Sequence, residues 1–237
     1  EVSLDFHKEG NCWQMSQKQF ERFAKKLSTA APDEACRLID RVYTTVDSLT
    51  AAEQDGTFIV FSDAMEQTFY QVDSPLRDDE LYLRILDREA RCTSLMSTDY
   101  RRVDWKRHLL QANAVGSEVI DLPISDSNCD ETTLHRLLDR QAVILIYGED
   151  CKACTKLMEE AVNSSVLKKA ASDDKLRLIS LYIGENNDEF AAKSVVLKYW
   201  ANYIDSRQLV RYENAFDSRL VPSLYLISDK KMVKVKG

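Results

Sequence analysis

The sequence of 237 residues predicts an α+β protein with two domains, an N-terminal all-α helical domain followed by an α/β domain. Two observations lead to this prediction. Up to about residue 114, apolar residues recur at the i, i+3, i+4 and i+7 spacing of amphipathic helices. After that point, short β-rich apolar runs alternate with helical segments. We place the helical domain at residues 1–114 and the α/β domain at 115–237, with a short linker at 113–117.

The first domain is predicted to contain several packed helices. Ser74 and Pro75 fit the start of one of them, with Ser as N-cap and Pro at the first helical position. A weaker pattern with Val103 and Leu110 predicts the last helix. The aromatic stripes most simply form a core, and a peptide-binding groove is the alternative, because this domain carries no catalytic constellation. The stronger helical stripes are Phe20, Phe23, Ala24 and Leu27; Ala35, Leu38, Ile39, Val42 and Val46; Phe58, Phe61, Met65 and Phe69; and Leu81, Ile85 and Leu86.

The second domain is predicted to alternate strands and helices. Its last two strands form a hairpin whose turn is Asp229 and Lys230. An aromatic group at helical spacing, Tyr199, Trp200 and Tyr203, is expected to pack on the sheet. The predicted order is strand 118–124, helix 131–139, strand 142–146, helix 155–171, strand 176–183, helix 188–203, strand 221–228 and strand 231–235.

The most informative motif is a pair of cysteines, Cys151 and Cys154, directly after the strand at 142–146. A strand that ends in Cys-x-x-Cys and continues into a helix is typical of a dithiol/disulfide redox centre. The two side chains lie on one face of the first helical turn, and unpaired backbone N–H groups there stabilise a thiolate. Cys151 is therefore the predicted attacking thiolate, and Cys154 is the predicted buried partner that resolves the mixed disulfide.

Two other interpretations of this pair are weaker. A zinc site needs a second Cys-x-x-Cys or a Cys/His pair at ligand spacing, and the other cysteines are isolated, so no metal site is predicted. A purely structural disulfide this short closes too small a loop to constrain the unfolded chain much. Cys36 and Cys92 are expected to be buried thiols, whereas the pairing of Cys12 and Cys129 stays open.

With this motif and order of elements, residues 116–237 resemble the thioredoxin-like domain of TlpA-like thiol–disulfide oxidoreductases of bacterial cell envelopes. The resemblance makes Cys151 and Cys154 the redox pair and implies no cofactor. Val221 and Pro222 match the cis-proline dipeptide that lies opposite the pair and binds substrate in that family. The helical segment before the thioredoxin-like domain, with residues 73–82, resembles an uncharacterised helical domain that is often fused in front of such domains in envelope proteins of anaerobic gut bacteria.

The sequence departs from this family at three places. Asp150 replaces the usual aromatic residue before the first cysteine, and Leu145 replaces the buried acid that accepts a proton. Glu149 or Asp150 could act as the base instead, although a solvated acidic rim is the simpler interpretation. These acids oppose the thiolate, whereas Lys152, Lys156 and the helix N-terminus favour it, so we expect a lowered thiol pKa for Cys151. The family's final helix is also missing, so either another segment covers that face or the chain is a fragment.

The predicted function is thiol–disulfide exchange with protein disulfides, together with a partner reductase or oxidase. The alternative is a non-catalytic interaction module that retains the fold. A net charge of −7 disfavours nucleic acid or an anionic membrane surface as partner, and no apolar run is long enough to span a bilayer. The start at Glu1 without Met indicates a removed signal segment or a trimmed chain. We expect the periplasm or cell envelope, with a lipid anchor before processing as one option, rather than the cytoplasm.

Overall fold

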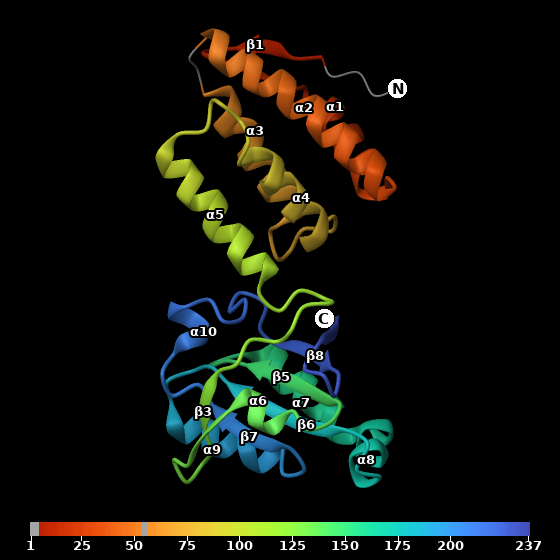
Figure 1. The fold of residues 1–237 in the computed structure, drawn as a ribbon, viewed down its shortest axis with the longest axis vertical. Helices are drawn as coiled ribbons and strands as arrows, with labels where there is room; N and C mark the ends of the chain where they lie inside the picture. Colours follow the sequence, from red (N-terminus) through yellow and green to blue (C-terminus); the bar gives the residue numbers. More distant parts are fainter. Residues whose placement is uncertain (1–4, 54–55) are drawn as a thin grey trace. The chain divides into compact units, whose positions relative to one another are not determined.

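The structure, a computed structural model, describes residues 5–53 and 56–237 (Figure 1). It divides into two compact units, Glu1–Leu110 and Gln111–Gly237. The first unit is helical, and the second is an α/β domain with a mixed sheet, so the predicted fold class is confirmed. No helix of the described residues has the length and apolar character needed to cross a membrane.

The N-terminal unit packs its helices around one aromatic core. The ring of Phe61 lies at the centre, 5.4 to 6.4 Å from the rings of Phe6, Phe20, Phe23 and Tyr43. A small antiparallel hairpin precedes the helices, and strands this short show no alternation from which to predict them. The elements are β1 (His7–Glu9), β2 (Cys12–Gln14), α1 (Gln17–Thr29), α2 (Pro32–Glu53), α3 (Thr57–Phe69), α4 (Asp79–Glu89) and α5 (Ser97–Gln111).

The predicted start of α4 at Ser74 and Pro75 is wrong. Ser74 lies in a turn, where its hydroxyl donates a 2.5 Å hydrogen bond to the carbonyl oxygen of Thr68. The N-cap is Asp78, whose carboxylate accepts a hydrogen bond of 2.9 Å from the backbone N–H of Leu81. Ser74 and Asp78 are both residue types that favour a helix N-cap, but only Asp78 is followed directly by helical residues.

The C-terminal unit contains a seven-stranded mixed sheet with the order β4-β3-β7-β6-β5-β8-β9. The central strand β5 runs parallel to β6 and antiparallel to β8, and the β8–β9 hairpin forms as predicted. The elements are β3 (Pro123–Ser125), β4 (Glu131–Thr133), α6 (Leu134–Leu137), β5 (Ala142–Tyr147), α7 (Lys152–Asn163), α8 (Ser165–Ser172), β6 (Arg177–Tyr182), α9 (Asn187–Val196), β7 (Ala201–Ile204), α10 (Leu209–Tyr212), β8 (Ser223–Ile227) and β9 (Val233–Lys236).

Each face of this sheet has its own core, and β5 contributes alternate residues to both. Ile144 and Ile146 join one cluster, and Leu145 and Tyr147 join the other, together with Cys154 of α7. The first face is covered by buried residues of the segments around β3, α6 and α10, among them Val119, Leu134, Val210 and Phe216.

Four predicted elements of this unit differ in the structure. The predicted strand at 118–124 is reduced to β3 at its end and an isolated bridge between Glu118 and Met232. The predicted helix at 131–139 is the strand β4 followed by the short helix α6. The predicted helix at 155–171 is interrupted at Ser164, whose hydroxyl accepts a hydrogen bond from Leu167 N–H and caps α8. The predicted helix at 188–203 ends at Val196, and Tyr203 lies in β7, where it pairs with Leu181 of β6. Tyr199 is exposed, whereas Trp200 is buried.

Candidate active site around the Cys151–Cys154 disulfide

The two motif cysteines form a disulfide at the junction of β5 and α7, with their Cα atoms 5.1 Å apart. Cys151 is the N-cap of α7, and its Sγ accepts a hydrogen bond of 3.0 Å from the backbone N–H of Cys154. Cys154 is fully buried at 0% exposure, whereas Cys151 is half-buried. An incoming group can therefore reach the first sulfur, and backbone N–H groups of the helix favour negative charge on it.

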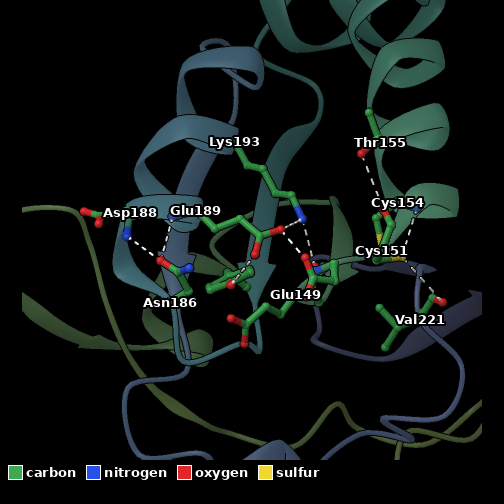
Figure 2. A network of polar contacts seen from close by, with 12 residues as sticks. Glu149, Cys151, Cys154, Thr155, Asn186, Asp188, Glu189, Lys193 and Val221 are labelled. Carbon is green, nitrogen blue, oxygen red and sulfur yellow. Dashed lines mark hydrogen bonds and ion pairs between the residues drawn. A yellow bond between two sulfur atoms is a disulfide. The ribbon is translucent and has the colours of Figure 1, made fainter.

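The peptide bond between Val221 and Pro222 is cis and lies just before β8. Because β8 pairs with β5, this dipeptide comes close to the end of β5, and the carbonyl oxygen of Val221 lies 4.0 Å from Cys151 Sγ. Figure 2 shows Val221 across from the disulfide. Two segments seventy residues apart in sequence thus meet at the half-buried Cys151.

A pocket of about 480 Å³ opens beside Cys151. Cys151 and Val221 are part of its wall, and its rim carries charges of both signs. No sequence pattern predicts that the residues after β6 and around α10 lie here, because only the strand order brings them close. The lining residues are Gly148, Glu149, Cys151, Ile183, Gly184, Glu185, Gln208, Arg211, Ser218, Arg219 and Val221.

The charged residues next to the cysteines in sequence, Glu149, Asp150 and Lys152, are exposed. The carboxylate of Glu149 accepts a long hydrogen bond of 3.4 Å from the backbone N–H of Glu185. Asp150 has a positive φ of 50°, a left-handed conformation that residues other than glycine seldom adopt. Leu145 is fully buried in the same core cluster as Cys154.

Figure 2 shows a polar network from α9 beside the segment 148–150, which sequence reasoning missed. Lys193 donates a hydrogen bond of 2.9 Å to the carbonyl oxygen of Gly148 and forms an ion pair with Glu189. Glu189 in turn accepts a hydrogen bond of 3.3 Å from the backbone N–H of Asp150. The only sequence signal was the i, i+4 spacing of Glu189 and Lys193, which most often marks a surface pair.

Aromatic rings enclose this ion pair. The Lys193 ammonium lies 5.6 Å from the ring centre of Tyr147 and 5.8 Å from that of Tyr182. Burial raises the pKa of Tyr147 to about 12 and that of Tyr182 further, so both rings are neutral at physiological pH. Burial of Glu189 favours its protonated form, but the hydrogen bond and charge of Lys193 outweigh it and lower the Glu189 pKa.

The remaining cysteines form no disulfide with this pair. Cys12, Cys36, Cys92 and Cys129 are free, with Cys92 buried, Cys36 half-buried and Cys129 exposed. The prediction of a buried thiol is therefore confirmed for Cys92 and only in part for Cys36. Within residues 5–53 and 56–237, no group of three His, Cys, Asp or Glu side chains is arranged to bind a metal ion.

Comparison with known proteins identifies the fold. No protein-family model and no curated protein matches the sequence. A thioredoxin-like protein from Bacteroides caccae has a similar structure, with a TM-score of 0.77 and 21% sequence identity over 92% of this chain and 78% of that one. The C-terminal domain of an uncharacterised protein from Bacteroides fragilis matches with a TM-score of 0.50 and 26% identity, over 52% of this chain and 89% of that one. The C-terminal unit therefore has a thioredoxin-like fold.

Proposed function

We propose that the protein is a thiol–disulfide oxidoreductase that acts on protein disulfides through Cys151 and Cys154. The observation that carries this proposal is the asymmetry of the pair: Cys151 is accessible at a pocket and at a helix N-terminus, whereas Cys154 is buried behind it. Exchange needs one thiol that substrate can reach and one that reacts only within the protein.

In the reduced protein, the Cys151 thiolate attacks one sulfur of a substrate disulfide. A new S–S bond to Cys151 forms, the substrate S–S bond breaks, and the departing sulfur takes a proton from solvent. Cys154 then loses its proton and attacks Cys151 Sγ, which restores the internal disulfide and releases the second substrate thiol. The substrate gains two electrons and two protons, and a dithiol protein acting as partner reductase returns them to the pair. A partner oxidase would run the cycle in reverse.

We assign substrate binding to Val221 and Pro222. The main chain of Val221 lies next to Cys151 at the edge of the pocket, where an extended substrate strand could pair with it in β fashion. Such pairing would orient the substrate sulfur toward Cys151. We assign to Glu149, Asp150 and Lys152 a modest influence on the thiolate, because exposed charges are screened by water.

We further propose that the protein belongs with the TlpA-like oxidoreductases and works in the periplasm or cell envelope, either free or anchored by lipid. This rests on the resemblance of the redox motif and of residues 73–82. In this proposal, residues 1–114 form a domain that selects client proteins, and residues 115–237 form the catalytic domain.

Reduction of insulin tests the activity. The reduced protein with excess dithiothreitol should accelerate insulin precipitation, and Cys151→Ser and Cys154→Ser should each lose this acceleration, because both thiols are needed for turnover. Cys129→Ser is the matched control, since it removes an exposed thiol outside the site. A wild-type rate equal to that of dithiothreitol alone would instead support the non-catalytic interaction module.

A further inference from the structure

We infer that Glu189 and Lys193 form a positioning pair, which fixes the segment before Cys151 and balances the charge near its thiolate. This inference rests on the proposed function, because it assigns the pair a role at the same centre. Both side chains project from α9 toward the loop between β5 and α7 (Figure 2).

The pair contacts the main chain of this loop at two points. Lys193 donates to the carbonyl oxygen of Gly148 at 2.9 Å, and Glu189 accepts from the N–H of Asp150 at 3.3 Å. Asp150 directly precedes Cys151 and has a φ of 50°. The left-handed conformation is less favourable than the right-handed one, and the hydrogen bond from Asp150 N–H to the Glu189 carboxylate helps to hold it.

The helix that carries the pair is itself well fixed. The side chain of Asn186 accepts hydrogen bonds of 3.0 and 3.1 Å from the N–H groups of Asp188 and Glu189, and so caps α9. Tyr182 donates a further hydrogen bond of 3.3 Å to Glu189. The pair is thus attached at one end to a capped helix and at the other to the active-site loop.

Because Glu189 and Lys193 are largely buried, water screens their charges only weakly. The side chains of Lys193 and Glu189 are only 13% and 21% exposed, and two tyrosine rings lie beside the ammonium group. Water therefore screens them less than it screens Glu149, Asp150, Lys152 and Lys156, the exposed charges of the loop and of α7. Arg211, Arg219, Glu185 and again Glu149 are the charged groups that line the pocket. Together Glu189 and Lys193 add no net charge, but each alone would add one.

This arrangement predicts opposite effects of two substitutions on the Cys151 thiol. Glu189→Gln leaves the Lys193 cation unbalanced, which favours the thiolate and should lower the thiol pKa by about half a unit, roughly a threefold shift in the ionisation constant. Lys193→Met leaves the Glu189 anion unbalanced and should raise the thiol pKa by a similar amount. The double variant should have nearly the wild-type pKa.

The experiment measures the alkylation rate of Cys151 by iodoacetamide against pH in the full chain, in a Cys154→Ser background, with mass spectrometry to identify the modified residue. Asp188→Asn is the matched control, because it neutralises an exposed carboxylate next to Glu189 and should leave the profile unchanged. Opposite shifts support the positioning pair. Absent shifts, shifts of the same sign, or a double variant far from wild type would overturn it. If one single variant fails to fold, the other decides, because the sign of its shift is predicted.

The alkylation profile does not depend on turnover, so the two proposals can fail separately. Opposite shifts in a protein that does not reduce insulin would support the pair and overturn the oxidoreductase assignment. Normal insulin reduction by the wild type, with an unchanged Cys151 thiol pKa in Glu189→Gln and Lys193→Met, would support the oxidoreductase assignment and overturn the role of the Glu189–Lys193 pair.

Discussion

At the scale of single residues, the network beside the disulfide depends on a glycine. A Cβ atom on Gly184 would lie 2.3 Å from the hydroxyl oxygen and 2.5 Å from Cζ of Tyr182. The Tyr182 ring is fully buried and stacks on Phe190, with 5.9 Å between ring centres, so it has little room to move away. Only a residue without a side chain at 184 allows Tyr182 to reach Glu189.

Gly184→Ala should therefore destabilise the C-terminal unit by about 1–3 kcal/mol through overpacking. Urea unfolding of the full chain measures this. Gly148→Ala is the matched control, because its added Cβ would meet Val221 at 3.4 Å, an ordinary contact, and it should change stability by less than about 0.5 kcal/mol. Equal stability of Gly184→Ala and wild type would contradict this steric explanation.

A second residue-scale prediction concerns Glu89, a carboxyl buried in the N-terminal unit at 1% exposure. Burial raises its pKa, although Ser62 and Tyr43 donate hydrogen bonds of 2.6 and 2.5 Å that partly offset this. Because the folded-state pKa is raised, Glu89 contributes stability below its unfolded pKa, and that contribution is lost as pH rises through the folded pKa.

Hydrogen exchange of the α2 and α4 amides between pH 4 and 8 checks this. Protection of the wild type should fall as pH rises through the Glu89 pKa, and Glu89→Gln should abolish that dependence because an amide does not titrate. Tyr43→Phe removes one donor to the carboxylate and should shift the fall to higher pH. A wild-type profile that matches Glu89→Gln would show that Glu89 titrates as an ordinary carboxyl.

The candidate site could be predicted only where its residues carry a local signal. The spacing of Cys151 and Cys154 after an apolar run is such a signal, and the resemblance added Val221 and Pro222. Glu189 and Lys193 have only a common i, i+4 spacing, and the atom that gives Lys193 its role, the carbonyl oxygen of Gly148, lies 45 residues away. No local pattern records a contact of that kind.

At the scale of elements, α9 determines where the network lies, and Asn186 determines where α9 begins. Replacing Asn186 with Ala removes the acceptor for two backbone N–H groups and should destabilise the protein by about 1 kcal/mol. Asn187→Ala is the matched control, because it changes the same residue type one position later, where no hydrogen bond of the side chain is described, and should cost less than about 0.5 kcal/mol. Equal losses of thermal stability in the two variants would show that Asn186 does not stabilise α9 as its cap.

Strand β7 shows why part of the fold was not predictable. Tyr199, Trp200 and Tyr203 have helical spacing, so the pattern extends the preceding helix. The structure ends that helix because the amide of Asn202 donates to the carbonyl oxygens of Leu197 and Trp200, at 3.2 and 2.9 Å. Its oxygen accepts a hydrogen bond of 2.6 Å from Ser180 of β6. The tertiary contacts of Asn202 thus override the local helical pattern. In contrast, β5, β6 and β8 were predictable because their apolar runs are too short for a typical helix.

At the scale of the whole molecule, the clustered core residues of each unit come from that unit alone. Those of the first unit end at Leu110, and those of the second begin at Val119. Residues 111–237 expressed alone should therefore fold cooperatively and reduce insulin at a rate comparable to the full chain. Thermal unfolding by circular dichroism, together with the insulin assay, checks this. A fragment without a cooperative transition would show that the second unit depends on the first.

The central claim is that Cys151 attacks substrate disulfides and Cys154 resolves them, and trapping of mixed disulfides tests it most directly. Cys154→Ser should accumulate stable mixed disulfides with client proteins, all linked through Cys151, because the attacking thiolate remains and the resolving thiol is gone. Cys151→Ser should trap none, since Cys154 is buried. Non-reducing electrophoresis and mass spectrometry of the two variants give the result. Equal, sparse trapping by both would contradict the account and leave the protein as an interaction module with an incidental disulfide.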